Sequence, residues 1–155
     1  SAQWMNRCHD LACFDLAVKK LRQHQIEVIV HIINGIPLED KTMMLKTINH
    51  INTLDIQGIK IHMLHVMKKT TLGHLYQKEP FDLLTLEDYV DIVVSQLEHL
   101  DPSIIVHRIT GDAPKDLLLG PTWTLKKFVV MNEIDKKMRA LNTYQGRLYK
   151  KEILV

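Results

Sequence analysis

The sequence is poor in the residues that build disulfide frameworks and metal centres. It has only two cysteines, Cys8 and Cys13, and its nine histidines form no H-x-H or H-E-x-x-H pattern. A disulfide framework needs more cysteines, and a tetrahedral zinc site needs ligands at motif spacing. We therefore expect two reduced thiols and no metal site formed by this chain alone.

Long apolar runs and a strong charge of one sign are also missing. The unbroken apolar runs are short, against about 20 residues for a membrane span, and the formal net charge is only +2. No positively charged stretch followed by an apolar one opens the chain, and no glycine-rich phosphate loop opens a helix. We expect a cytoplasmic protein with no membrane partner, and this charge does not indicate a nucleic-acid partner.

The composition is that of one soluble domain. Of the 155 residues, 46% are hydrophobic and 25% are charged, which are ordinary values for a globular domain. The chain contains no repeat, low-complexity run or internal boundary. Residues 1–155 are therefore expected to form a single domain.

Helical and β-branched segments alternate along the chain. The patterns predict helices at 11–25, 38–54, 72–77, 86–100 and 122–141. They predict buried strands at 27–33, 58–66 and 104–109, and a loop at 111–121. Thr85 is expected to cap its helix, with Asp88 in the capping-box position. This order predicts an α/β fold whose parallel strands are joined by right-handed helical crossovers.

Polar residues recur on one face of the predicted strands. Because alternate residues of a strand share a face, Val28, Val30 and Ile32 lie opposite His31, and Ile59, Ile61 and Met63 lie opposite Lys60 and His62. In the third strand the alternation sets Val106 and Arg108 against Ile105, His107 and Ile109, which leaves open whether Arg108 joins the polar face. The aliphatic face is expected to meet the helices.

Two interpretations of the polar face are available. A histidine in a single strand is more often a hydrogen-bonded core residue, whereas polar positions on three neighbouring strands favour a wet or ligand-filled interior. Dry, unpaired burial would cost several kcal/mol for each group. His31, His62 and His65 fall late in their strands, and parallel βα units bind ligands at that end.

Five segments occur in a specific order: VHIINGIPLEDKTMMLKT, QGIKIHMLHVMKKTTLGHLY, EDYVDIVVSQLEHL, IIVHRITGDAPKDLL and PTWTLKKFVVMNEID. Together they resemble one branch of the radical S-adenosylmethionine (radical SAM) superfamily. That branch comprises bacterial iron–sulfur oxidoreductases of undefined substrate, related to the elongator radical SAM subunit and the oxygen-independent coproporphyrinogen oxidases. The resemblance extends from Met5 to Tyr149.

The resemblance implies a partial (β/α) TIM-type barrel, with the three strands as barrel strands five onward and a C-terminal helix. It also implies a parent enzyme that uses a [4Fe-4S] cluster and SAM to generate a 5′-deoxyadenosyl radical, which abstracts hydrogen from an unknown substrate. The cluster is held by a C-x3-C-x2-C loop that this sequence lacks, since Cys8 and Cys13 are spaced C-x4-C without a third partner. The chain is thus expected to be a C-terminal segment, inactive and free of both cofactors on its own.

The resemblance also assigns candidate residues. For SAM it implies the turn after the first strand and the wall of the second: Ile33, Asn34, Gly35, His62, Met63, Leu64 and His65. The usual G-x-I-x-G-x-x-E pattern matches only at Ile33 and Gly35, because Leu38 replaces its glutamate and Glu39 comes one place late. Position in the barrel suggests a substrate-side pocket of His31, Lys60, His107, Arg108, Thr110 and Asp112.

Two kinds of partner are expected. One is the N-terminal half-barrel that carries the cluster. The other is a second copy of the chain, because a sheet taken from a barrel leaves unpaired edges that recruit strands. The alternative function is a non-catalytic binding or assembly module derived from a barrel.

Overall fold

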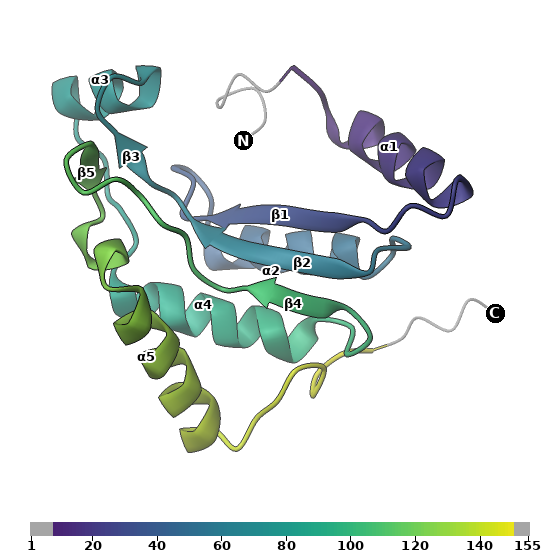
Figure 1. The fold of residues 1–155 in the computed structure, drawn as a ribbon. Helices are drawn as coiled ribbons and strands as arrows, with labels where there is room; N and C mark the ends of the chain where they lie inside the picture. Colours follow the sequence, from purple (N-terminus) through teal and green to yellow (C-terminus); the bar gives the residue numbers. More distant parts are fainter. Residues whose placement is uncertain (1–7, 151–155) are drawn as a thin grey trace.

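The computed structural model describes residues 8–150, and the opening residues on which the absence of a leader was judged lie outside them. Figure 1 shows helices and strands alternating along the chain. The helices are α1 (Leu11–Gln23), α2 (Lys41–Ile51), α3 (Thr71–Lys78), α4 (Leu86–His99) and α5 (Lys127–Ala140), with a 3₁₀ turn η1 (Thr122–Leu125). The strands are β1 (Ile29–Asn34), β2 (Gly58–Met63), β3 (Val66–Met67), β4 (Ile105–Arg108) and β5 (Leu118–Gly120).

The central sheet has three parallel strands in the order β1-β2-β4. The register of β1 on β2 extends from Ile29 opposite Gly58 to Asn34 opposite Met63. α2 connects β1 to β2, and α3 and α4 lie between β2 and β4 in the chain. The α/β class and the three parallel strands predicted from the sequence are confirmed.

One face of this sheet is covered by helices. Ile59 and Ile61 have no exposed surface, and Val30 is only 6% exposed. They belong to one apolar cluster with Ile48 of α2 and Val93 of α4. In Figure 1, α4 lies below the sheet and α2 lies behind the sheet. Full burial of each such side chain contributes about 1.5–3 kcal/mol to folding, so this face supplies the main stabilisation.

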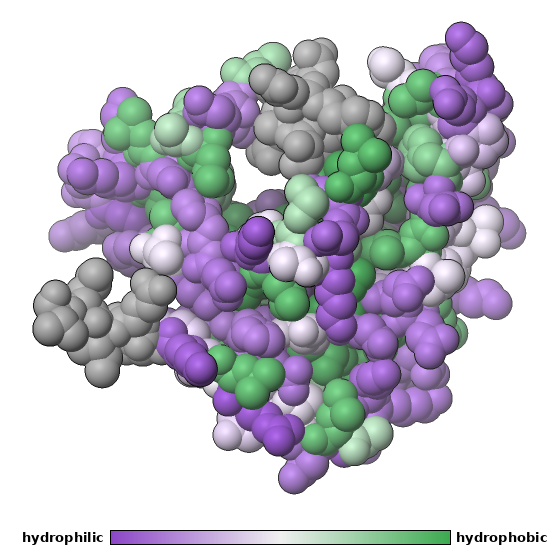
Figure 2. All heavy atoms as spheres, turned by 180° about the vertical axis from the view of Figure 1, so that it is seen from behind, coloured by the Kyte–Doolittle hydropathy of each residue, from purple (hydrophilic) through white to green (hydrophobic). Residues whose placement is uncertain are grey.

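The surface opposite the view of Figure 1 is predominantly polar. Seen from behind, hydrophobic residues form scattered patches among hydrophilic ones (Figure 2). Within residues 8–150, no helix combines the length and the apolar character that a membrane crossing requires.

Side-chain caps begin the first four helices. Asp10, Asp40, Thr70 and Thr85 accept hydrogen bonds from the backbone N–H three residues later. In the last case the Thr85 hydroxyl also donates to the Asp88 carboxylate at 2.6 Å. The predicted cap at Thr85 is confirmed, and a cap of this kind is typically worth about 1 kcal/mol.

The structure corrects the predictions after the second strand. The strand predicted at 58–66 ends at Met63, and the region predicted as a loop, 111–121, contains β5. β5 pairs antiparallel with β3, and this partner is distant in sequence, so local patterns gave no sign of it. The helix predicted at 122–141 is divided into η1 and α5, because Lys126 has a non-helical backbone between them.

Candidate functional site

The face of the central sheet away from α2 and α4 carries the predicted polar residues. His31 is exposed there, and Lys60 and His62 are half-buried. The rings of His31 and His62 lie 5.4 Å apart between centroids. We call this surface, formed by Ile29, His31, Ile33, Gly58, Lys60, His62, Ile105, His107 and Arg108, the open face.

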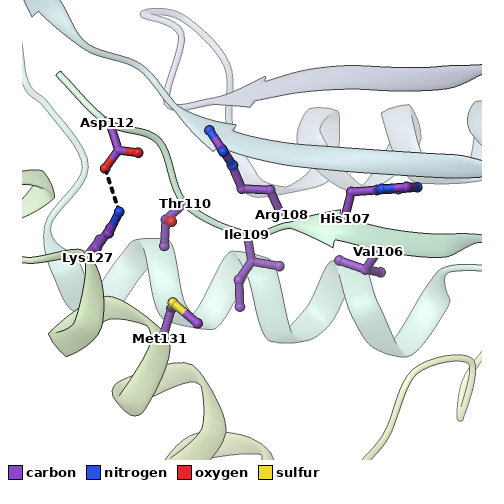
Figure 3. A pocket seen from close by; sticks show the side chains of 8 residues that line it. All are labelled: Val106, His107, Arg108, Ile109, Thr110, Asp112, Lys127 and Met131. Atoms are coloured by element: carbon purple, nitrogen blue, oxygen red, sulfur yellow. Dashed lines mark ion pairs between the residues drawn. The ribbon is translucent and has the colours of Figure 1, made fainter.

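A β-bulge brings Arg108 onto the open face. Ile59 pairs with Val106, but Lys60 pairs with Arg108, so that β4 contains one extra residue, His107. Simple alternation would have separated Arg108 from His107. Instead, the guanidinium of Arg108 points away from α4, whereas Val106 and Ile109 point toward it (Figure 3).

His107 lies against the neighbouring strand. A Cβ atom added to Gly58 would come within 2.5 Å of the His107 Nε2 atom, which is closer than such contacts allow. Gly58 therefore provides the space in which the His107 ring rests on the sheet. No residue with a side chain at position 58 would permit this placement without a shift.

Two histidines near the carboxyl end of β2 have buried nitrogens without partners. The Nε2 atoms of His62 and His65 are covered and make no hydrogen bond within the described part of the chain. Burial lowers the pKa of both rings, and the positive charges of His31 and Arg108 lower the pKa of His62 further. The Asp112 carboxylate acts in the opposite direction on the pKa of His65.

The residues that the resemblance assigns to SAM are split between the two faces. Ile33 is 43% exposed on the open face, beside its register partner His62. Asn34 is 2% exposed and Met63 is 3% exposed. The Asn34 amide exchanges hydrogen bonds of 2.8 and 2.9 Å with the Gln96 amide of α4, and the Met63 sulfur accepts from the Gly111 N–H. A ligand on the open face would therefore meet the backbone, not the side chains, of Asn34 and Met63.

Gly35 makes the turn at the carboxyl end of β1. Its φ of +86° is unfavourable for other residues, and an added Cβ would lie 2.8 Å from a Leu84 methyl carbon. The space beside Gly35 is thus filled by this chain's own Leu84. A shallow depression remains nearby, lined by Asn34, Gly35, Met63, Leu64, Leu83, Leu84, Pro121 and Trp123.

A larger depression lies between β4 and α5. It has a volume of about 360 Å³ and is shown in Figure 3. Its lining includes four of the six residues suggested for the substrate side: His107, Arg108, Thr110 and Asp112. His31 and Lys60 are not part of its lining, and Thr110, which is 6% exposed, points toward the helices.

Two residues of this depression, Lys127 and Met131, were not predicted from the sequence. The Lys127 ammonium lies 3.3 Å from the Asp112 carboxylate. The sequence around Lys126 and Lys127 predicts a solvated helix face. No local pattern connects these lysines with the loop after β4.

The described residues do not fit an iron–sulfur cluster. Cys8 and Cys13 are both free and exposed. Between residues 8 and 150, no group of three or more histidine, cysteine, aspartate or glutamate side chains could hold a metal ion. A cluster would need ligands from outside residues 8–150.

Comparison with known proteins shows which family this chain resembles. The family model described as the Radical_SAM C-terminal domain matches residues 56–140. The chain is 45% identical over 151 residues to the uncharacterized protein YtqA of Bacillus subtilis, covering 97% of this chain and 47% of YtqA. It is 31% identical over 132 residues to the protein YhcC of Escherichia coli, covering 85% of this chain and 43% of YhcC. The chain thus spans about half the length of these curated relatives.

A solved structure has the same fold. The archaeal Elp3 of Methanocaldococcus infernus, with an N-terminal deletion, superposes with a TM-score of 0.73 at 18% identity. The match covers 88% of this chain and 33% of the Elp3 chain. At this identity the likeness concerns the fold alone. Because the family model covers more than half of its residues, this chain belongs to the radical SAM C-terminal domain family.

Proposed function

We propose that this chain is the C-terminal part of a radical SAM iron–sulfur oxidoreductase. The complete enzyme would cleave SAM reductively and use the 5′-deoxyadenosyl radical to abstract hydrogen from a substrate. The observation that carries the proposal is the two-sided sheet: the aliphatic face packs on helices, and the face with His31, Lys60 and His62 is left uncovered by them. That arrangement suits one wall of an enclosed reaction chamber.

The chain's own contribution to SAM would be the carboxyl end of β1 and β2. Ile33 offers an apolar side chain at that end of the open face, beside His62. An adenine ring could pack on this isoleucine, while the backbone after Gly35 supplies hydrogen-bonding groups. A complete wall would also exclude water from a reactive intermediate.

A matched pair of variants tests this role. Ile33 and Ile29 lie on the same strand and face and are similarly exposed, at 43% and 40%, but only Ile33 is at the carboxyl end. The chain would be co-expressed with the polypeptide encoded upstream, or with the N-terminal half of YtqA, and reconstituted anaerobically with iron and sulfide. We expect Ile33→Asn to raise the KM for SAM about tenfold or more in a 5′-deoxyadenosine assay, and Ile29→Asn to leave it unchanged.

Failure of the assembled protein to form 5′-deoxyadenosine from SAM and a strong reductant would contradict the proposal. It would favour the alternative, a non-catalytic binding or assembly module. Equal effects of the two variants on the KM for SAM would show that Ile33 does not contact SAM. The proposed enzymatic activity would still stand.

We also propose that the outer edges of the central sheet are partner sites. β1 and β4 each pair with β2 alone among residues 8–150. The N-terminal half-barrel would cover these edges in the assembled enzyme, and a second copy of the chain would do so in its absence. Sedimentation of the chain alone should give a dimer, and a monomer at high concentration would argue against the second copy.

A further inference from the structure

On the open face, two residues with permanent positive charges occupy paired positions of neighbouring strands without a counter-charge. Lys60 of β2 and Arg108 of β4 are register partners, and neighbouring strands are only about 4.8 Å apart. Neither side chain makes an ion pair or hydrogen bond with any residue in the range 8–150. Like charges on neighbouring strands repel each other, so the charges of this pair do not stabilise the sheet.

The surroundings add imidazole rings and no negative charge. His31 and His62 lie beside Lys60, and His107 is the bulged residue next to Arg108. Within the three strands, no acidic side chain lies on the open face. The flanking acids lie outside them, Glu27 before β1 and Asp112 after β4, and Asp112 is already paired with Lys127.

A covered polar atom without a partner belongs to a residue of the same face. The His62 Nε2 atom is covered and makes no hydrogen bond to the described chain. Such atoms are rare in native proteins and call for a missing partner. A neutral imidazole can donate from this nitrogen, and an oxyanion is an acceptor that would satisfy it.

A metal ion is a poorer occupant than an anion. Two nearby permanent cations repel a divalent cation, and the partly covered setting strengthens that repulsion. The described residues also offer no group of three metal-ligating side chains. Arg and Lys are instead the side chains that bind carboxylate and phosphate oxygens by charge-assisted hydrogen bonds.

We propose that Lys60 and Arg108 form an oxyanion subsite on the open face that holds a carboxylate or phosphate group of a bound small molecule. His31 and His62 flank the bound group, and Ile33 and Ile105 provide apolar surroundings that strengthen the electrostatic interaction. The inference rests on the proposed function in one respect, that the open face lines the interior. It does not require that SAM is cleaved.

The test measures anion binding by the 155-residue chain. Inorganic phosphate, pyrophosphate and succinate would be titrated by calorimetry, with the His62 imidazole resonances followed by NMR. We expect saturable binding of at least one of these probes, with a shift of the His62 resonances. Lys60→Met and Arg108→Gln should each weaken it about tenfold, and Lys60→Arg should restore it.

Matched controls remove the same charges elsewhere. Lys46→Met on α2 and Arg139→Gln on α5 change exposed cations of the helix layer and should leave binding unchanged. Thermal unfolding would confirm that every variant folds, which is expected because the open-face positions contribute little to the core.

Competition in the assembled protein distinguishes the source of the anion, because the chain alone is not expected to hold SAM. Displacement by SAM but not by 5′-methylthioadenosine, which has no carboxylate, would assign the subsite to the SAM carboxylate. Absence of displacement by SAM would assign it to the substrate. The proposal is overturned if no probe binds saturably, or if the control variants weaken binding as much as Lys60→Met and Arg108→Gln do. Because SAM cleavage is a separate assay on the assembled protein, either idea can fail alone.

Discussion

The two faces of the central sheet use the same strands for opposite purposes. Ile59 and Ile61 are fully buried against helices, whereas Lys60 between them faces away with His62. On the helix-covered face, the side chains are buried and closely packed. The open face leaves like charges adjacent and the His62 Nε2 atom unpaired. The difference indicates that the helix-covered face supplies the stability, and the proposed subsite would give the open face a role in ligand recognition.

The largest expected effect on stability comes from truncating one isoleucine on each face. Ile59 has no exposed surface, and Ile105, on the open face, is 62% exposed. Ile59→Ala should lower the free energy of unfolding by about 3–4 kcal/mol, since it leaves a cavity in the core. Ile105→Ala should lower it by less than about 0.5 kcal/mol. Urea denaturation measures both, and similar losses would contradict the comparison.

The polar pair on the helix-covered face should give the next largest effect. Gln96→Leu leaves the buried Asn34 amide without its reciprocal hydrogen bonds. We expect a loss of about 1–3 kcal/mol in the free energy of unfolding. The double variant Asn34→Leu/Gln96→Leu should recover part of it, because no unpaired amide remains. Additive losses in the double-mutant cycle would show that the two amides are not coupled.

Removing a charge from the open face should raise the free energy of unfolding, whereas the two changes above lower it. Lys60→Thr relieves the repulsion with Arg108 and should raise the free energy of unfolding by about 0.2–1 kcal/mol. Lys60→Arg retains the charge and should leave stability unchanged. A clear loss of stability in Lys60→Thr would show that the lysine supports the fold.

The smallest expected effect is a pH dependence from His62 and His65. Burial lowers the pKa of both rings below the ordinary 6.5. The unfolded chain therefore takes up these protons at a higher pH than the folded chain, and the free energy of unfolding should fall as the pH drops through 6.5. Because both rings are partly solvated, we expect a change of less than about 1 kcal/mol. The variant His62→Gln/His65→Gln should flatten this part of the pH profile, and an unchanged profile would contradict it.

The sequence predicted the faces of β1 and β2 because strict alternation needs no long-range information. Val30 and Ile32 had to lie opposite His31, and they do. Alternation failed in β4, because one extra residue moves Arg108 to the other face and neither glycine nor proline marks the bulge.

The contacts that the sequence could not predict join distant segments. The Asn34–Gln96 pair spans 62 residues, and Lys127 reaches Asp112 from another element. The pairing of β3 with β5 is equally nonlocal. Side chains of this kind carry no local pattern, since each is ordinary in its own segment.

The most direct measurement is histidine labelling with diethylpyrocarbonate in the chain alone and in the assembled protein. His31 and His107 are exposed on the open face, and His74 is exposed on α3, which is not part of this sheet. If the open face lines an enclosed chamber, assembly should slow labelling of His31 and His107 about tenfold or more, while His74 reacts as before. Unchanged labelling of His31 and His107 after assembly would contradict the account.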